Sequence, residues 1–277
     1  MIARVPASSA NMGPGFDTLG MALSLYAEVG VGAPLDEGAR AADEHHPAMV
    51  AFRRHGGEGD LWVRSPIPVG RGMGFSGAVR VGGLVAAHAQ RHGESPTSLD
   101  EARDSLLAIA TELEGHADNV AASLYGGIVA TAGGRAVRIR LSFDPAMVMW
   151  VPTFSTSTDE SRGRLPAEVP LADVVFNIGR TALLVAALAA GDVGALRTAT
   201  EDRLHQDRRV AAAEPSRAAL AAALAGGAWA AWLSGSGPTV AVMCAMDEAE
   251  DIAASLPTDG HTKILRIDHG GATIEAG

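Results

Sequence analysis

The sequence predicts a mixed fold of helices and strands, organised as one large domain or as two closely packed ones. The chain has 277 residues, of which 47% are hydrophobic, so it can bury a sizeable core. Strand-like and helix-like apolar runs follow one another along it, without internal repeats or low-complexity tracts. A strongly apolar run at residues 146–152 marks the expected start of a second half.

The composition limits the partners. A net charge of −10 without a basic block argues against nucleic acid. Lys263 is the only lysine, so arginines are expected to bind any anionic ligand. Cys244 is the only cysteine, which excludes an internal disulfide, and no zinc-binding spacing occurs. The start lacks signal-peptide character, and uninterrupted apolar runs such as residues 183–190 are shorter than a membrane span, so we expect a cytoplasmic protein without a membrane partner.

Periodicity and the positions of glycine and proline place the elements of the first half. Pro6 is expected to end the first strand, and an irregular loop at residues 7–20 follows it. Asn11 and Asp17 are the notable polar residues of this loop, and capping of turns or of the next helix is one interpretation of them. The expected elements are strands at residues 2–5, 21–31 and 61–64, and helices near 18–25 and at 46–55, 76–90 and 99–113.

The second half is read in the same way. Residues 155–161 are polar and are expected to form a turn. Residues 202–209, with the sequence DRLHQDRR, are expected to form a solvated, charged helix face. The expected elements are strands at residues 137–141, 146–152, 228–233, 240–244 and 262–267, and helices at 172–190, 194–210, 215–224 and 247–256.

A glycine-rich stretch at residues 70–77 has the character of an anion-binding loop. It follows an expected strand and opens a helix, so backbone N–H groups and the helix dipole can converge on a polyphosphate. An ordinary strand-to-helix turn is the alternative interpretation. Residues 72–77 also match G-x-G-x-x-G, but a dinucleotide-binding loop belongs in the first strand–turn–helix unit, and here a long segment precedes it. No Gly-Lys-Ser/Thr follows, so the loop is not a Walker A motif.

A second dense polar group lies at residues 112–119. Glu112 or Glu114 can serve as a hard oxygen ligand for magnesium, whereas His116, Asp118 and Asn119 suit a hydroxyl or ammonium group. A solvated helix end followed by an N-cap at Asp118 or Asn119 is the alternative. The serine–glycine loop at residues 234–239 can support the first glycine loop by placing small residues against it.

Three separated stretches, VPASSANMGPGFDTLG, PIPVGRGMGFSGA and SGSGPT, resemble in order and spacing the motifs of the GHMP small-molecule kinases. LEGHADNVAASLYGG, STDESRGRLP and DRLHQDRR extend the resemblance over nearly the whole chain. It implies an α+β protein with the GHMP kinase fold, and a homodimer. Residues 1–145 would form an ATP-binding domain similar to domain 2 of ribosomal protein S5, and residues 146–277 a ferredoxin-like α/β sandwich.

The resemblance is to the branch of the family that acts on L-homoserine. It implies phosphorylation of the side-chain hydroxyl of this small-molecule substrate to O-phospho-L-homoserine, a step of threonine biosynthesis, with ATP and Mg²⁺ as cofactors. Arg71 would help to spread the charge of the transition state.

The site residues that the resemblance implies fall into four groups. ATP would contact Pro68, Gly70, Arg71, Gly72, Met73, Gly74, Ser76 and Gly77. The metal would be bound by Ser76 and Glu114, with Glu112 as the alternative to Glu114. The substrate would contact Asn11, Asp17, His116, Asn119, Arg162 and Arg209. The residues placed at the transferred group are Asp118, Asn119 and Arg162, with Asn119 orienting the hydroxyl and Asp118 a candidate base.

The sequence departs from the family pattern in the glycine loop. Phe75 stands at the first serine of the usual Ser-Ser pair, and Gly77 stands at an alanine. This departure supports two further hypotheses: a kinase for another small hydroxylated metabolite, and a non-catalytic ligand-binding descendant. A dinucleotide-dependent oxidoreductase is the hypothesis outside the family.

Overall fold

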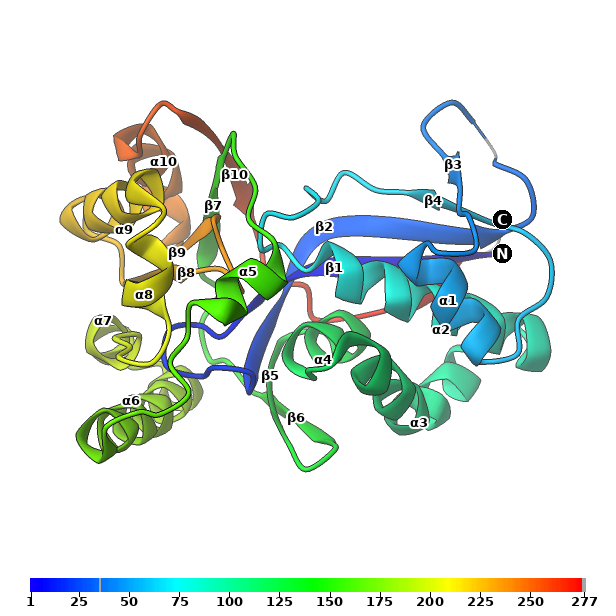
Figure 1. The fold of residues 1–277 in the computed structure, drawn as a ribbon, viewed down its shortest axis with the longest axis horizontal. Helices are drawn as coiled ribbons and strands as arrows, with labels where there is room; N and C mark the ends of the chain where they lie inside the picture. Colours follow the sequence, from blue (N-terminus) through cyan, green and yellow to red (C-terminus); the bar gives the residue numbers. More distant parts are fainter. Residues whose placement is uncertain (35, 276–277) are drawn as a thin grey trace.

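The computed structural model describes residues 1–34 and 36–275 and contains two antiparallel sheets (Figure 1). The order of the first sheet is β11-β1-β2-β4-β3, with β5 also beside β2 and β6 beside β5. Its strands are β1 (Ile2–Ala10), β2 (Leu19–Val31), β3 (Arg40–Ala41), β4 (Leu61–Arg64), β5 (Ile128–Ala132), β6 (Arg135–Ile139) and β11 (Thr273–Glu275). The second sheet has the order β10-β7-β9-β8. Its strands are β7 (Ala146–Pro152), β8 (Ala230–Leu233), β9 (Val240–Cys244) and β10 (Gly260–Leu265). The expected mixture of helices and strands is confirmed.

Two expectations about the N-terminal strands are wrong. β1 continues through Pro6 to Ala10, because its pairing with β2 shifts register between Pro6 and Ala7 instead of ending there. The helix expected near residues 18–25 does not form, because this segment is the start of β2, paired with β1 on one side and with β5 on the other.

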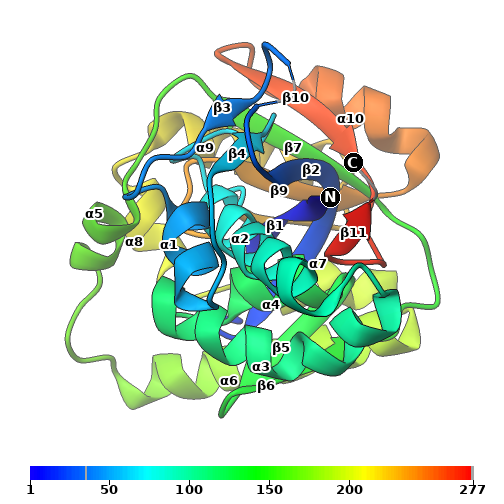
Figure 2. The ribbon, with the colours of Figure 1, turned by 90° about the vertical axis from the view of Figure 1, so that its right-hand side faces the viewer.

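Four helices gather on one side of the first sheet (Figures 1 and 2). They are α1 (Pro47–Arg54), α2 (Phe75–His92), α3 (Pro96–Glu114) and α4 (Asp118–Tyr125). α2 is the central one and is buried along most of its length. Gly83 allows this close packing, since a Cβ atom there would lie 2.1 Å from the carbonyl oxygen of Ala48 in α1. The N-terminus of α2 is thereby fixed at the end of the glycine loop.

β7 joins the two halves of the molecule, and its bounds match the expected strand. Met147, Met149 and Val151 point into the large core that also contains β1, β2 and α2. Val148 and Trp150 point into a second core beneath two further helices. These helices are α9 (Glu214–Ala225) and α10 (Ala249–Ser255). Because both faces of β7 are buried, its sequence is a continuous apolar run.

The connection between β7 and α9 differs from its prediction. Residues 155–161 do not form only a turn, because α5 (Thr158–Gly163) begins within them. The single helix expected at residues 194–210 is wrong: α7 (Leu196–Ala199) and α8 (Gln206–Val210) are separate. The break lies at Asp202, whose carboxylate accepts hydrogen bonds from the backbone N–H groups of Leu204, His205 and Gln206. A side chain that binds several N–H groups in this way ends one helix and starts another.

The remaining long helix, α6 (Leu171–Ala190), is unusually apolar. The uninterrupted apolar runs of the sequence are shorter than a membrane span. The whole helix, however, is long and apolar enough to cross a membrane, judged by its length and composition alone. Core helices of soluble proteins can pass the same test. Asn177, Leu184, Ala187 and Leu188 are the residues through which α6 is buried against the rest of the chain.

A last strand was not expected from the sequence. After β10, the chain crosses back to the first sheet, where β11 pairs with β1 and Glu275 lies opposite Ile2 (Figures 1 and 2). The segment is only three residues long, so its side chains carry almost no periodic signal.

Candidate active site

The glycine-rich loop lies between β4 and α2 and is held tightly by neighbouring segments. Gly70, Gly72 and Gly74 have positive φ angles of 67°, 72° and 68°, which other residues rarely adopt. A Cβ atom on Gly72 would lie 2.1 Å from the carbonyl oxygen of Ser234. The Ser234 hydroxyl donates to the Gly72 carbonyl at 2.6 Å. The expected support of this loop by the serine–glycine loop is therefore confirmed.

α2 begins without a side-chain cap. Its N-cap residue is Gly74, which has no side chain that could accept a hydrogen bond from the first turn. The amide groups of that turn keep their capacity to bind an anion, and the helix dipole adds partial positive charge. Gly74, Phe75 and Ser76 line a cavity of about 210 Å³. The geometry suits a phosphate group at this end of the cavity.

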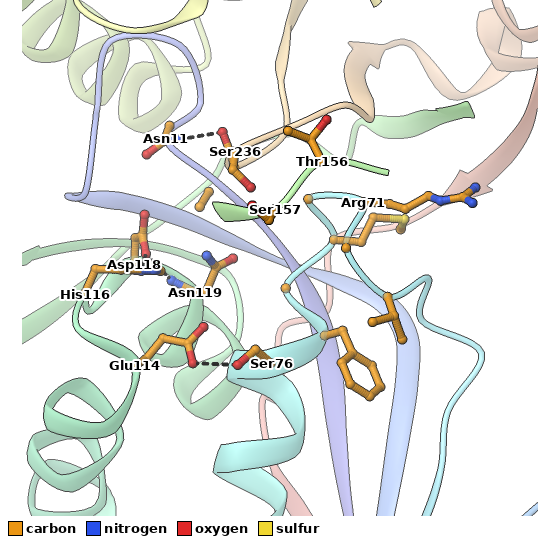
Figure 3. Close-up of a pocket in the computed structure, with 18 of the residues that line it drawn as sticks. Asn11, Arg71, Ser76, Glu114, His116, Asp118, Asn119, Thr156, Ser157 and Ser236 are labelled. Carbon is orange, nitrogen blue, oxygen red and sulfur yellow. Dashed lines mark hydrogen bonds and ion pairs between the residues drawn. The ribbon is translucent and has the colours of Figure 1, made fainter. Parts of the chain in front are cut away.

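Most of the residues singled out in the sequence meet in this one cavity (Figure 3). Those lining it are Asn11, Asp17, Pro68, Gly70, Arg71, Gly72, Met73, Gly74, Ser76, Glu114, His116, Asp118, Asn119, Arg162 and Arg209. Gly77 lies behind the wall, where a Cβ atom would meet the Cβ of Asn119 at 3.2 Å. Thr156, Ser157 and Ser236 also line the cavity. They were not singled out individually, because short hydroxyl side chains within polar stretches carry no distinguishing signal.

Ser76 and Glu114 form the polar pair at the start of α2. The Ser76 hydroxyl donates to Oε2 of Glu114 at 2.9 Å (Figure 3). Arg80, one helical turn after Ser76, donates to the same oxygen at 2.6 Å. Glu112 points elsewhere and pairs with Arg54 on the surface. Of the two alternative carboxylates, Glu114 is the one beside Ser76.

The turn between α3 and α4 carries a second polar group, formed by His116, Asp118 and Asn119. Asp118 is the first residue of α4 and is only 2% exposed, and the N-cap is Ala117, so the alternative that Asp118 or Asn119 is an N-cap is wrong. The helix end that this alternative placed before it does exist, because α3 ends at Glu114 and Glu112 and Gly115 are exposed. Oδ1 of Asp118 lies 2.6 Å from Nδ1 of His116 and accepts from the backbone N–H of Asn119 at 2.7 Å. Burial lowers the pKa of His116, but the hydrogen bond to Asp118 and its charge outweigh this and raise the pKa above its ordinary value.

Asn11 and Asp17 shape the N-terminal loop at the opposite wall. Both have positive φ angles, of 68° and 56°. The Asn11 side chain donates to the carbonyl of Gly235 at 2.9 Å and accepts from the backbone N–H of Asp17 at 3.0 Å. Capping of this turn by Asn11 is thus confirmed, whereas Asp17 forms a bidentate ion pair with Arg162, at 2.7 and 3.0 Å.

Arg209 reaches the cavity from α8. It is 4% exposed, so the expectation that residues 202–209 form a solvated face is wrong for this side chain and also for His205. Its Nη1 atom contacts Nδ1 of His205 and the carbonyl of Gly235, both at 3.2 Å. Burial, together with the charge of Arg162, lowers the pKa of Arg209 to about 10. The Phe16 ring lies 5.5 Å from the guanidinium of Arg162 and 5.3 Å from that of Arg209.

Two residues of the glycine loop use their side chains for packing. Arg71 points away from the cavity and donates to the backbone carbonyls of Pro152 and Thr153, so this guanidinium braces the loop against the end of β7 (Figure 3). Phe75 packs against the large core and lies edge-on to His46, with ring centroids 6.3 Å apart.

The fold and the cavity define an enzyme of the small-molecule kinase class. Residues 40–127 match the model of the GHMP kinases N terminal domain, and residues 184–262 match that of the GHMP kinases C terminal domain. The chain therefore belongs to the GHMP kinase family.

Comparison of sequences shows to which kinases of this family the chain is similar. The chain is 42% identical to the homoserine kinase of Streptomyces coelicolor, over 98% of this chain and 93% of that protein. It is 37% identical to the homoserine kinase of Thermus thermophilus, over 96% of each. Solved structures share the fold. The homoserine kinase of Cytophaga hutchinsonii superimposes with a TM-score of 0.85 at 22% identity, covering 99% of this chain and 97% of that one. The mevalonate kinase of Methanococcus jannaschii gives 0.70 at 15% identity, covering 96% and 98%.

Proposed function

We propose that this kinase transfers the γ-phosphoryl group of ATP to the side-chain hydroxyl of L-homoserine, giving O-phospho-L-homoserine. One observation carries the proposal. A single cavity joins an uncapped helix N-terminus, suited to phosphates, to a wall bearing Asp17, Arg162 and Arg209, suited to the charges of an amino acid. Relatives named homoserine kinase, similar over nearly the whole chain, support this acceptor.

The nucleotide is assigned to the glycine loop. The backbone N–H groups of this loop and of the first turn of α2 would bind the triphosphate of ATP. The contacts proposed are those at Pro68, Gly70, Arg71, Gly72, Met73, Gly74, Ser76 and Gly77. Arg71 would contribute through its backbone, since its side chain is bonded to the carbonyls of Pro152 and Thr153.

The donor set beside the loop fits Mg²⁺. Ser76 and Glu114 offer a hydroxyl and a carboxylate oxygen 2.9 Å apart at the cavity wall, and hard oxygen ligands are those that Mg²⁺ prefers. When bound there, the ion would neutralise charge on the transferred phosphoryl group. Arg80 donates to the same carboxylate oxygen as Ser76 and so helps to hold Glu114 beside Ser76.

The acceptor is assigned to the other walls. Arg162 and Arg209 would bind its carboxylate, and Asn11 and Asp17 its ammonium group. Oxygen or nitrogen atoms of Asp17, His116 and Asp118 lie within 4.8 Å of one another, a polar pocket suited to a small cation. Asn119 would orient the hydroxyl, and Asp118 stays a candidate for its proton.

Phosphoryl transfer needs mainly alignment and charge neutralisation, which these groups supply. The test is a panel of homoserine, threonine, mevalonate and shikimate, each with ATP and Mg²⁺, followed by coupled detection of ADP. Turnover is expected with homoserine. Turnover of another alcohol while homoserine is inert would favour a different GHMP-type kinase. Nucleotide binding without ADP release would favour a non-catalytic descendant.

The assembly and location belong to the same proposal. We propose a cytoplasmic homodimer, for which the exposed apolar side chains of α6, such as Leu171, Val175 and Ile178, offer a surface. We also propose that the chain divides into an N-terminal domain at residues 1–145 and a C-terminal domain at residues 146–277. β11 is the exception, since it belongs to the first sheet. Residues 276–277 lie outside the described part of the chain. Light scattering in solution gives the mass of the assembly.

A further inference from the structure

The glycine loop touches the segment that connects β7 with α5, residues 153–157. This connecting segment forms neither helix nor strand. The backbone N–H of Thr156 donates to the carbonyl of Gly70 at 3.1 Å, and a Cβ atom on Gly70 would lie 3.5 Å from the Cβ of Ser155. Two stretches that are far apart in the sequence are thus in direct contact at the edge of the cavity.

Arg71 supplies the other bonds between these two stretches. Its Nη1 atom donates to the carbonyl of Pro152, and its Nη2 atom donates to that of Thr153 at 2.7 Å. The planar guanidinium holds its donors in a fixed fork, so it binds two successive carbonyls at once. Figure 3 shows this side chain pointing away from the cavity. Burial, followed by the charges of Lys263 and Arg71, lowers the pKa of His261 in β10, so the guanidinium lies toward the second sheet.

The connecting segment leads directly into α5. Ser157 caps this helix by accepting from the backbone N–H of Glu160 at 3.0 Å. Ser161 is buried and donates to the carbonyl of Ser236 at 3.0 Å, which holds α5 against the serine–glycine loop. Arg162, the next residue, lines the cavity. The position of this wall therefore depends on Ser161 and, through the connecting segment, on Arg71.

We propose that Arg71 is a positioning residue that aligns the nucleotide with the acceptor, because it joins the glycine loop to the segment that leads into α5. This inference rests on the proposed function, which assigns the triphosphate to the loop and the acceptor to the wall beside α5. It differs from the spreading of transition-state charge that the family resemblance implies for Arg71. Phosphoryl transfer depends on the alignment of its reacting groups, and a small misplacement can lower the rate about a hundredfold.

The test separates alignment from binding. Arg71→Met keeps an unbranched apolar stem but removes both hydrogen bonds. Its kcat with homoserine should fall roughly 10- to 100-fold. The dissociation constants of a non-hydrolysable ATP analogue and of homoserine, each measured by calorimetry, should change by less than about threefold. Arg71→Lys keeps the charge but lacks the fork, so it should restore kcat only in part.

A second measurement does not depend on turnover. Hydrogen–deuterium exchange is followed in peptides that cover the glycine loop and the connecting segment, with and without the ATP analogue. In the wild type, the analogue should slow exchange in both, since the N–H of Thr156 is bonded to Gly70. In Arg71→Met, protection should remain in the glycine loop and be lost in the connecting segment.

Arg53→Met is the matched control. It removes a guanidinium that also donates to two backbone carbonyls, those of Gly57 and Gly59. Arg53 is not among the described residues that line the cavity. Its replacement should leave kcat, both dissociation constants and the exchange pattern as in the wild type. Melting curves show whether each variant is folded.

The outcomes distinguish this inference from the proposed function. Weaker binding of the ATP analogue in Arg71→Met, restored in Arg71→Lys, would show that the guanidinium binds phosphate and would overturn the inference. An unchanged kcat in Arg71→Met would also overturn it. If the wild type phosphorylates no homoserine, but the analogue protects the connecting segment only when Arg71 is present, the proposed function fails while the link between the loop and this segment is supported.

Discussion

Nδ1 of His205 lies 3.2 Å from Nη1 of Arg209, while Nε2 of the same ring lies 2.7 Å from the carbonyl oxygen of Gly13. A carbonyl only accepts hydrogen bonds, so Nε2 carries the proton and Nδ1 accepts from Arg209. Burial lowers the pKa of His205 and keeps the ring neutral. His205 is therefore a positioning residue that ties Arg209 to the N-terminal loop.

Two substitutions separate the bonds made by His205. In His205→Asn, the side-chain oxygen can still accept from Arg209, whereas in His205→Gln the amide nitrogen can still donate to Gly13. We expect His205→Gln to raise the KM for homoserine about tenfold, equivalent to losing one charge-assisted hydrogen bond, and His205→Asn to raise it less. The KM for ATP should change little in both. Equal effects on both substrates would mean that the ring acts through general stability.

Glu114 and Glu112 provide a matched pair for testing the metal site. Glu114→Gln removes the carboxylate charge beside Ser76, so the Mg²⁺ concentration for half-maximal activity should rise at least about tenfold. Glu112→Gln lies on the same helix but loses only the surface pair with Arg54, and should behave as wild type. Titration with Mn²⁺, followed by electron paramagnetic resonance, measures the affinity directly. Equal affinities in the two variants would place the metal elsewhere.

Asp118 is tested by its conversion to asparagine. Oδ1 of Asp118 already holds His116 and the N–H of Asn119, which is a positioning arrangement. Asp118→Asn should therefore lower kcat by less than about a hundredfold, below most of the range of a general base. Single-turnover rates with saturating substrates provide the measurement. A loss of about a thousandfold or more would instead identify Asp118 as the base.

A histidine cluster far from the cavity should make folding sensitive to acid. The His88 ring stacks on His55, with centroids 6.2 Å apart, and is tilted against His92, with centroids 4.8 Å apart. Burial, with nearby positive charges including Arg91, lowers the pKa of His55 and of His88. Their stabilising effect is complete above the unfolded pKa of about 6.5 and is lost as the pH falls through the lowered folded pKa.

The size of this effect is set by linkage. Each proton bound only by the unfolded chain lowers the free energy of unfolding by up to about 1.4 kcal/mol per pH unit, and by less where solvent screens these partly exposed rings. Melting temperatures at about pH 7.5 and about pH 5.5 are compared for the wild type and His88→Gln. The variant should lose less on acidification. An unchanged difference would show that the cluster is not responsible.

Local patterns predicted much of the fold. The strand at 146–152 was predicted to the residue because both its faces are buried, and the glycine loop because its residues are contiguous. The helix expected at 194–210 failed because Asp202 binds backbone N–H groups, which periodicity does not record. β11 was missed because three residues form a strand only when β1 is beside them.

Side-chain contacts of the site were less accessible from the sequence. The motifs identified most residues of the cavity. They did not show that Arg80 binds Glu114, or that Arg71 binds the backbone at the end of β7. Nor did they show that Asp17 pairs with Arg162. Each of these contacts joins segments brought together only by the tertiary fold, so no local pattern encodes it.

The most direct test of the central claim is ³¹P NMR of the full chain incubated with ATP, Mg²⁺ and L-homoserine. The account predicts a new phosphomonoester signal, coupled to the protons of the side-chain carbon that bore the hydroxyl, growing in step with ADP. Release of inorganic phosphate alone, or no change in ATP under conditions in which homoserine binds, would contradict it.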